Sequence, residues 1–224
     1  MDAQHTLGWY RARLGNITGS KVGDIMKSGR KKDELFGDTA KTYIYQVAAE
    51  RGMNPVIVED DDLFSDYVSQ VNISTKAMDW GNEQEEAARR LYQTITGRSV
   101  VEVGSCMHPT IEHFASSPDG FYYDEETQEK GCIEIKCPNQ ATFMKYKDLI
   151  HDNKSLLEVK PEYFYQCMAH MMCNNASWTD FVVYCPFQIK PVHIVRIYPD
   201  DKVFKEMEMR INEANKLINE ILNR

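Results

Sequence analysis

The segment Gly131-Cys132-Ile133-Glu134-Ile135-Lys136-Cys137-Pro138 predicts a buried β-strand that carries two charged side chains. Side chains two residues apart on a strand point to the same face, so Glu134 and Lys136 are expected to lie side by side. Burying a carboxylate and an ammonium group is costly unless each has a partner. The segment therefore predicts a polar site inside an otherwise apolar sheet.

A third charged group precedes this strand at hairpin distance. The run Ser116-Ser117-Pro118-Asp119-Gly120 leads into the apolar residues 121–123, which we expect to form the adjacent antiparallel strand. Asp119 would then approach Glu134 and Lys136. Two carboxylates and a lysine that converge on a sheet suit a hard cation and an activated water molecule.

The Asp/Glu-x-Lys spacing proves little by itself, because it also begins at Asp152, Glu158 and Asp200 in polar surroundings. Only Glu134-x-Lys136 lies within an apolar strand. The alternative is a surface salt bridge on an edge strand. The Pro118-Asp119 pair upstream favours a functional site.

The composition limits the class of protein. A chain of 224 residues suits one large domain, and a net charge of −8 argues against a protein that coats nucleic acid through a basic surface. An enzyme with a local basic track remains possible. Six cysteines without a C-x-x-C pair argue against structural zinc and suggest a reducing compartment. We find neither a signal peptide nor a membrane span, so we expect a soluble, cytoplasmic protein.

The first part of the chain is predicted to be helical. Gly15 ends a short helix that begins near Trp9, and residues 17–20 open the next helix, with Thr18 or Ser20 as its cap. Arg13 and Ser20 at that helix start suit a phosphate pocket, although a capped helix with a solvated arginine is the simpler interpretation. Residues 28–34 form a charged loop and residues 39–51 a helix. The acidic residues 59–75 read as a solvated insertion.

A further helix should cover residues 79–92 and end at Gly97. Ala88, Leu91, Tyr92 and Ile95 would form its apolar face. Glu85 lies one turn earlier, on or beside that face. It is a candidate additional carboxylate for the metal site.

The remaining elements follow from apolar periodicity. We expect strands at residues 100–107, 114–123, 131–137, 178–185 and 193–198, and helices at 141–150, 161–174 and 203–222. The first three strands form a meander, and Gln166 lies close to the apolar face of its helix. This order predicts an α/β fold with a central mixed sheet flanked by helices. The chain is expected to be one domain, with a helical part (1–98, including a loop insertion at about 56–76), a sheet core (99–199) and a final helix (200–224).

An ordered set of motifs resembles the phage lambda exonuclease family, also called YqaJ-type viral recombinases, within the restriction-endonuclease-like PD-(D/E)xK nucleases. The set runs along nearly the whole chain: Trp9-x-x-x-Arg13-Leu14-Gly15-x-Ile17-Thr18-x-Ser20, Trp80-Gly81 with Glu85, Ser117-Pro118-Asp119-Gly120, Glu134-Ile135-Lys136-Cys137-Pro138 and Gln166. The 59–75 and 124–130 segments look longer than in the lambda enzyme.

This resemblance implies a phage or prophage enzyme of the bacterial cytoplasm. Such enzymes degrade one strand of linear duplex DNA processively from its 5′ end, release mononucleotides and act as ring-shaped homotrimers. A single-strand annealing protein loads onto the remaining 3′ strand for recombination. Such a ring with a basic bore would reconcile DNA binding with the acidic net charge.

The resemblance also implies a role for each matched residue. Asp119 and Glu134 look like Mg²⁺ ligands, together with the backbone carbonyl of Ile135. Glu85 resembles the acid near a second Mg²⁺ ion, and Mn²⁺ could substitute for Mg²⁺. Lys136 resembles the residue that positions and activates the attacking water. The DNA contacts implied are a 5′-phosphate pocket (Arg13, Ser20, Ser117), a phosphate or supporting contact (Gln166), a basic loop (Arg30) and an apolar wedge between base pairs (Met78).

Other functions remain open. A RecB-like or Cas4-like nuclease shares the Asp, Glu-x-Lys and Gln pattern, although Cys167, Cys173 and Cys185 do not supply the cysteines of a Cas4-type iron–sulfur cluster. A restriction-type endonuclease is a further alternative. The third is a non-catalytic DNA-end-binding module, against which the intact Asp119, Glu134 and Lys136 argue.

Overall fold

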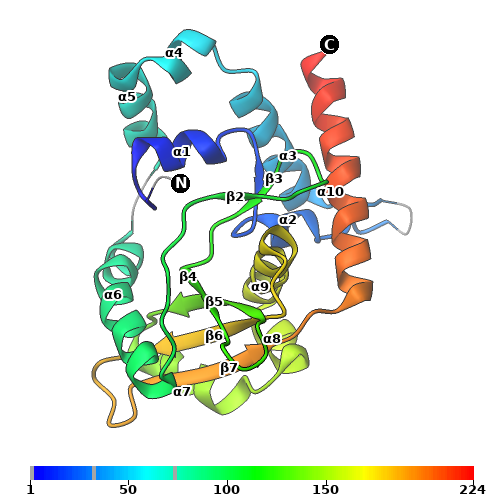
Figure 1. Cartoon of the computed structure of the whole chain (residues 1–224). Coiled ribbons are helices and arrows are strands. Elements are labelled where there is room, and N and C mark those ends of the chain that lie inside the picture. Colours follow the sequence, from blue (N-terminus) through cyan, green and yellow to red (C-terminus); the bar gives the residue numbers. More distant parts are fainter. Residues whose placement is uncertain (1–2, 32–33, 73–74) are drawn as a thin grey trace.

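The computed structural model describes residues 3–31, 34–72 and 75–224 and contains a four-stranded mixed sheet, which lies in the lower half of Figure 1. The strand order is β4 (Gly120–Tyr123), β5 (Lys130–Lys136), β6 (Trp178–Tyr184) and β7 (Val192–Ile197). Only β5 and β6 are parallel. A parallel pair needs a long crossover, which here consists of α7 (Gln140–Leu149), α8 (Asn153–Val159) and α9 (Pro161–Asn174). The expected mixed sheet and flanking helices are confirmed.

The alternation of side chains along β5 divides its residues between two layers. Cys132 belongs to the larger core cluster, with Met168 of α9, whereas Ile133 and Ile135 pack with Tyr92 of α6 (Lys76–Thr96). Helices α9 and α6 therefore cover opposite faces of the sheet. Glu134 lies two residues after Cys132, so its side chain points to the same face of the sheet, the face that α9 covers.

A separate small sheet corrects the expected meander. Its order is β1 (Ile17–Thr18), β3 (Phe114–Ser116) and β2 (Cys106–Met107). The single strand predicted over residues 114–123 is divided between the two sheets, because Pro118 has no backbone N–H for a ladder. Of the strand predicted at 100–107, only β2 and an isolated bridge at Val101 form.

Residues 17 and 18 were expected to open a helix but form β1, which pairs in parallel with β3. Helix α2 (Val22–Ile25) begins later, with Lys21 as its N-cap and no side-chain cap. Thr18 and Ser20 are therefore not capping residues. Gly15 adopts φ +69°, the left-handed conformation that glycine tolerates, at the turn after α1 (Leu7–Arg13).

The acidic segment after residue 55 is helical, which corrects the expected loop insertion. It forms α4 (Pro55–Glu59) and α5 (Asp61–Val71). Asp60 caps α5 by accepting hydrogen bonds from the backbone N–H groups of Asp62 and Leu63, so part of the charge run has a local role. Phe64 of α5 is fully buried. Residues 73–74 of the predicted insertion, like 32–33 of the charged loop, lie outside the described residues.

Helix α6 ends at Gly97 with φ +71°, as expected, but its buried face differs from the prediction. Ala88, Arg89 and Tyr92 are buried, whereas Ile95 is 57% exposed. The next position of the buried stripe is Thr96, four residues after Tyr92, rather than Ile95. Each residue turns the helix by about 100°, so Thr96 falls between Tyr92 and Arg89 around the axis, whereas Ile95 falls just outside Ala88, at the edge of the stripe.

Two long helices pack together beside the small sheet. In α10 (Asp201–Leu222), Met207, Ile211, Ala214 and Ile218 are buried, and the helix packs against α3 (Asp38–Arg51) and α2. Arg210 donates hydrogen bonds to the carbonyls of Ile25 and Leu35 and to Ser28 Oγ, at 3.3, 2.9 and 2.7 Å. This helix therefore holds the N-terminal segment in place. Across the described ranges, every helix is too short or too polar to cross a bilayer. All six cysteines are free thiols.

Candidate active site

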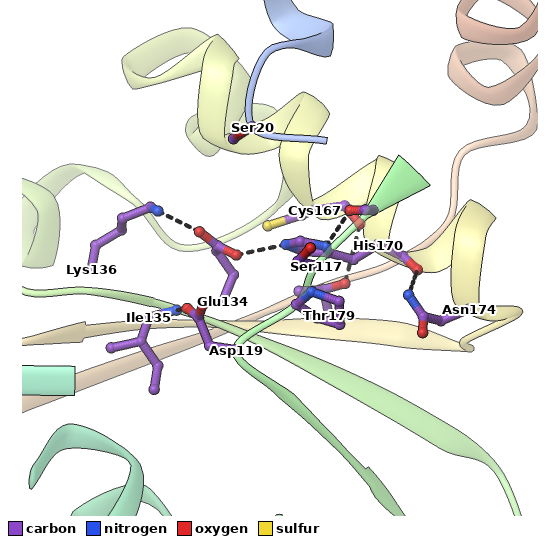
Figure 2. Close-up of polar contacts among 12 residues, drawn as sticks. Ser20, Ser117, Asp119, Glu134, Ile135, Lys136, Cys167, His170, Asn174 and Thr179 are labelled. Atoms are coloured by element: carbon purple, nitrogen blue, oxygen red, sulfur yellow. Dashed lines mark hydrogen bonds and ion pairs between the residues drawn. The ribbon is translucent and has the colours of Figure 1, made fainter. Parts of the chain in front are cut away.

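Three charged side chains meet where β4 and β5 pair (Figure 2). Glu134 and Lys136 project from β5, and Lys136 Nζ forms an ion pair with Glu134 Oε1. Asp119 precedes β4, and its Oδ2 accepts a hydrogen bond of 2.6 Å from the Ile135 N–H. The Asp119 N–H also donates to the Ile133 carbonyl at 3.1 Å. Strand pairing thus fixes both carboxylates beside Lys136, as the sequence predicts.

Burial and mutual repulsion set the charge states of this group. Burial raises the pKa of Asp119 well above its usual range, and the negative charges of Glu134 and Glu85 add to that rise. Burial also disfavours ionised Glu134, but Lys136 and a hydrogen bond from His170 outweigh it and lower the pKa of Glu134. The pKa of Lys136 is raised because Glu134 and Asp119 outweigh the effect of burial. The site therefore combines a cation with an excess of carboxylates.

His170 of α9 is a site residue that the sequence analysis missed. Its Nε2 lies 2.6 Å from Glu134 Oε2, and its Nδ1 lies 2.6 Å from Ser116 Oγ. Because Nε2 donates to the carboxylate, Nδ1 accepts from the serine hydroxyl in the neutral ring. His170 lies one turn after Gln166, on the same face of α9, and this i to i+4 spacing is the signal that could have identified it.

Arg89 is the second missed residue, and it ties α6 to the site. One guanidinium nitrogen lies 2.5 Å from Glu85 Oε1, and Nε donates to the Asp119 carbonyl at 3.2 Å. A further nitrogen lies 2.5 Å from Glu102. Burial raises the pKa of Glu85, although Arg89 opposes the shift. Glu85 is thus oriented next to Asp119, where the sequence predicted an additional acid.

Arg13, Ser20 and Ser117, for which the resemblance implies a phosphate pocket, lie close together in the structure. Ser117 Oγ accepts hydrogen bonds of 3.1 Å from Arg13 and from the Trp9 indole N–H. Another guanidinium nitrogen of Arg13 lies 3.3 Å from Ser20 Oγ, and the guanidinium stacks over the Trp9 ring at 4.3 Å. Burial lowers the pKa of Arg13, but arginine stays charged in proteins. The pocket offers one fixed positive charge and two hydroxyl groups.

A cavity of about 810 Å³ joins the phosphate pocket to the charged group. This volume suits a small ligand or one end of a polymer. Of the predicted site residues, ten line the cavity: Arg13, Ser20, Met78, Glu85, Ser117, Asp119, Glu134, Ile135, Lys136 and Gln166. Arg30 is exposed and does not line it.

The donors in this cavity suit a hard divalent cation. Magnesium takes oxygen ligands and retains several waters, so one or two carboxylates suffice. Within the described ranges, no three histidine, cysteine, aspartate or glutamate side chains are arranged to hold a metal ion. Both oxygens of Glu134 instead contact Lys136 and His170. Asp119, Glu85 and Glu134 nevertheless line one cavity with the Ile135 backbone, an oxygen donor set of the kind that Mg²⁺ takes, so the residues fit.

A mixed sheet flanked by helices, with two acids and a lysine where β4 pairs with β5, is the arrangement of a nuclease of the restriction-endonuclease-like fold. The family model described as the YqaJ-like viral recombinase domain matches residues 8–177. The chain belongs to this family, and it is a homologue of an alkaline exonuclease. That homology makes it a nuclease-type hydrolase.

Solved structures extend the match to almost the whole chain. An alkaline exonuclease (LHK-Exo) from Laribacter hongkongensis is 29% identical, with a TM-score of 0.75 over 97% of this chain and 95% of that one. The same enzyme in complex with dAMP matches at 30% identity, with the same TM-score and coverage. A phage-related exonuclease from Haemophilus somnus 129PT, 16% identical with a TM-score of 0.68 over 93% and 95% of the two chains, shares the fold. No curated protein matches the chain.

Proposed function

We propose that this protein is a Mg²⁺-dependent exonuclease that degrades linear double-stranded DNA from the 5′ end. It releases mononucleotides and leaves a 3′ single strand for recombination by strand annealing. The observation that carries the proposal is one cavity that joins Asp119, Glu134 and Lys136 to the Arg13–Ser117 pocket. Hydrolysis and recognition of a phosphate end can therefore take place within one nucleotide-sized space.

The chain's own residues divide the work of phosphodiester hydrolysis. Asp119, Glu134 and the Ile135 carbonyl would hold one Mg²⁺ and Glu85 a second, and these ions supply an activated water and balance the charge of the transition state. Lys136 is close enough to Glu134 to orient that water and to add positive charge. His170 and Arg89 keep Glu134 and Glu85 in place.

The phosphate pocket supports selection of the DNA end. Arg13, Ser117 and Ser20 offer charge-assisted hydrogen bonds of the kind that phosphate groups accept. A terminal 5′-phosphate bound there would place the adjacent phosphodiester near Asp119 and Glu134. Gln166, which is 9% exposed, contacts the same strand from α9, and Met78 lies at the exposed side of the cavity. Arg30 contacts DNA further from the site.

The proposal includes the assembly and its setting. A ring-shaped homotrimer would enclose the duplex and explain processive digestion by a chain whose net charge is −8. The partner is a single-strand annealing protein that receives the 3′ strand. The setting is the cytoplasm of a bacterial host. The measured mass in solution, compared with 25.9 kDa for one chain, tests the trimer.

Digestion of linear duplex DNA with Mg²⁺ tests the function, with ends that carry a 5′-phosphate compared with ends that carry a 5′-hydroxyl. We expect mononucleotides, faster release from 5′-phosphate ends and intact closed circles. Lys136→Ala should abolish release and serves as the catalytic control. Cutting of closed circles would indicate an endonuclease instead. Binding of ends without any Mg²⁺- or Mn²⁺-dependent cleavage would indicate a DNA-end-binding module.

A further inference from the structure

Two aromatic rings stack at the edge of the cavity, and the functions assigned so far do not use them. Phe187 lies in the turn between β6 and β7, and Trp80 lies in the second turn of α6. Their ring centroids are 5.6 Å apart and their planes differ by 16°. Both residues line the cavity that contains Asp119 and Glu134. Segments more than a hundred residues apart in sequence thus contribute one aromatic surface to the site.

The exposure of Phe187 is unusual for a ring that is already stacked. It remains 66% exposed although one face packs on Trp80, so the other face is open to solvent. Single exposed apolar side chains are ordinary, but this ring is joined along the same cavity by Met78, which is 56% exposed. Ile189, in the same turn, is fully exposed and does not line the cavity. The aromatic surface is therefore a feature of the cavity and not of the whole turn.

We propose that the open face of Phe187, supported from behind by Trp80, is a stacking subsite for a nucleobase of the DNA strand whose phosphates occupy the cavity. The proposal rests on the proposed function. Every nucleobase has an aromatic face, so stacking is strong and tolerant of sequence, as a processive nuclease requires. The subsite would hold a base while Arg13 and Ser117 hold a phosphate, which gives the strand two fixed points.

The local structure makes Phe187 suitable for this role. Pro186 precedes it and restricts the backbone of the turn, and Trp80 restricts the ring. A ring that is already ordered loses little conformational freedom when a base stacks on it. The charged groups deeper in the cavity offer no apolar surface to a base, whereas Phe187 does.

A double-mutant cycle between the protein and its substrate tests the proposal. Phe187→Ala and wild type are compared on duplex DNA with normal 5′-terminal nucleotides and on the same DNA with abasic sites at the first three positions. We expect Phe187→Ala to raise KM about tenfold on normal DNA, within the range for loss of one stacked base, and to have almost no effect on abasic DNA. Phe187→Tyr, which keeps the ring, should retain wild-type KM on both substrates.

Two further variants control for structure. Phe187→Leu keeps an apolar side chain without a ring and should show the same loss as Phe187→Ala, which excludes a folding defect as the cause. Ile189→Ala changes the same turn outside the cavity and should leave KM unchanged. The stacking subsite would be overturned if Phe187→Ala raised KM equally on normal and abasic DNA, or if Ile189→Ala raised KM as much as Phe187→Ala. Either result would leave the nuclease assignment intact.

A binding measurement separates failure of the subsite from failure of the proposed function. With EDTA present, an oligonucleotide that carries 2-aminopurine at its 5′ end should lose fluorescence on binding wild type, because stacking quenches this base. Phe187→Ala should bind it about tenfold more weakly and without the quench. This readout does not depend on cleavage. An unquenched probe bound equally by both proteins would overturn the subsite even in an inactive protein.

Discussion

Two buried carboxylates on neighbouring strands of this sheet differ in the partners that surround them. Glu134 of β5 and Asp180 of β6 are each 1% exposed, and they point to opposite faces because Asp180 is paired with Ile133. Asp180 Oδ1 accepts from Arg196 at 2.8 Å, and Oδ2 accepts from the hydroxyls of Tyr92 and Tyr122 at 2.6 and 2.7 Å. Its charge is met by fixed donors.

Glu134 lies instead in a cavity that it shares with other acids. Its partners, Lys136 and His170, satisfy both oxygens, yet nearby Asp119 is left with a pKa raised by burial and by the surrounding negative charge. The group around Asp180 therefore stabilises the fold, whereas the group around Glu134 and Asp119 brings together carboxylates whose negative charges disfavour one another. Buried charges that are not fully balanced by their neighbours are expected at functional sites. Four predictions test this contrast.

Lys136→Ala should have the largest effect on function. Loss of the group that we propose to orient the attacking water should lower kcat about 10²–10⁴-fold, with little change in affinity for DNA. Steady-state digestion and end-binding assays measure the two separately. Lys154→Ala is the matched control, because Lys154 also lies two residues after an acid, Asp152, but is 83% exposed. An active Lys136→Ala enzyme would remove Lys136 from the mechanism.

Asp180→Ala should have the largest effect on stability. Removal of this carboxylate leaves Arg196 and two tyrosine hydroxyls without their acceptor, so the free energy of unfolding should fall by about 3 kcal/mol. Urea denaturation measures the change. Tyr92→Phe, which removes one donor and leaves the ion pair, should cost about 1 kcal/mol. A stable Asp180→Ala protein with normal activity would contradict the structural role.

His170→Ala should act through Glu134, the proposed metal ligand. The concentration of Mg²⁺ needed for half-maximal activity should rise about 10–100-fold, because the hydrogen bond that orients Glu134 is lost. His170→Gln retains an N–H donor and should recover part of the affinity. His151→Ala, an exposed histidine away from the cavity, should change nothing. An unchanged Mg²⁺ requirement in His170→Ala would show that His170 only fills space.

Asp119→Asn should give the smallest effect, and it should raise the stability of the metal-free protein, whereas Asp180→Ala lowers stability. The folded pKa of Asp119 lies above the unfolded value, so ionisation costs more in the folded protein and destabilises it above the unfolded pKa of about 3.9. Without metal, the variant should therefore melt a few degrees higher at neutral pH, since 1 kcal/mol corresponds to about 2–4 °C for this size. The difference should vanish at pH values below the unfolded pKa. Thermal melts in EDTA, from neutral pH to pH values below the unfolded pKa, measure the difference in melting temperature. A lower melting temperature for the variant would contradict the destabilisation assigned to the buried Asp119 charge.

The sequence predicted those parts of the fold that depend on local pattern. The strands and helices after residue 131 came from apolar periodicity, and α7, α9 and β6 lie within a residue or two of the predicted bounds. Helix α8 was missed because its seven residues carry little periodic signal. The charge run at residues 60–62 hid α5, because capping aspartates and solvated aspartates look alike in sequence. The division of residues 114–123 between two sheets depends on tertiary pairing that no local pattern contains.

The candidate site divides in the same way. Asp119, Glu134 and Lys136 could be found because strand spacing and a turn bring them together. Arg13 and Ser117 were grouped only through the family resemblance, since more than a hundred residues separate them. His170 and Arg89 escaped notice because a histidine on an apolar helix and an arginine on a charged one look unremarkable. The contact of His170 with Glu134 joins residues far apart in the sequence, whereas Arg89 lies one turn after Glu85, an i to i+4 spacing that the sequence does contain.

The hydrogen bonds from Arg210 to the carbonyls of Ile25 and Leu35 have a consequence for when the protein becomes active during its synthesis. The ribosome makes α10 after every element that lines the cavity, yet α10 holds the segment that follows Ser20. We therefore expect a nascent chain still inside the exit tunnel to lack an ordered phosphate pocket. The proposed nuclease would then become competent only after α10 has emerged from the tunnel.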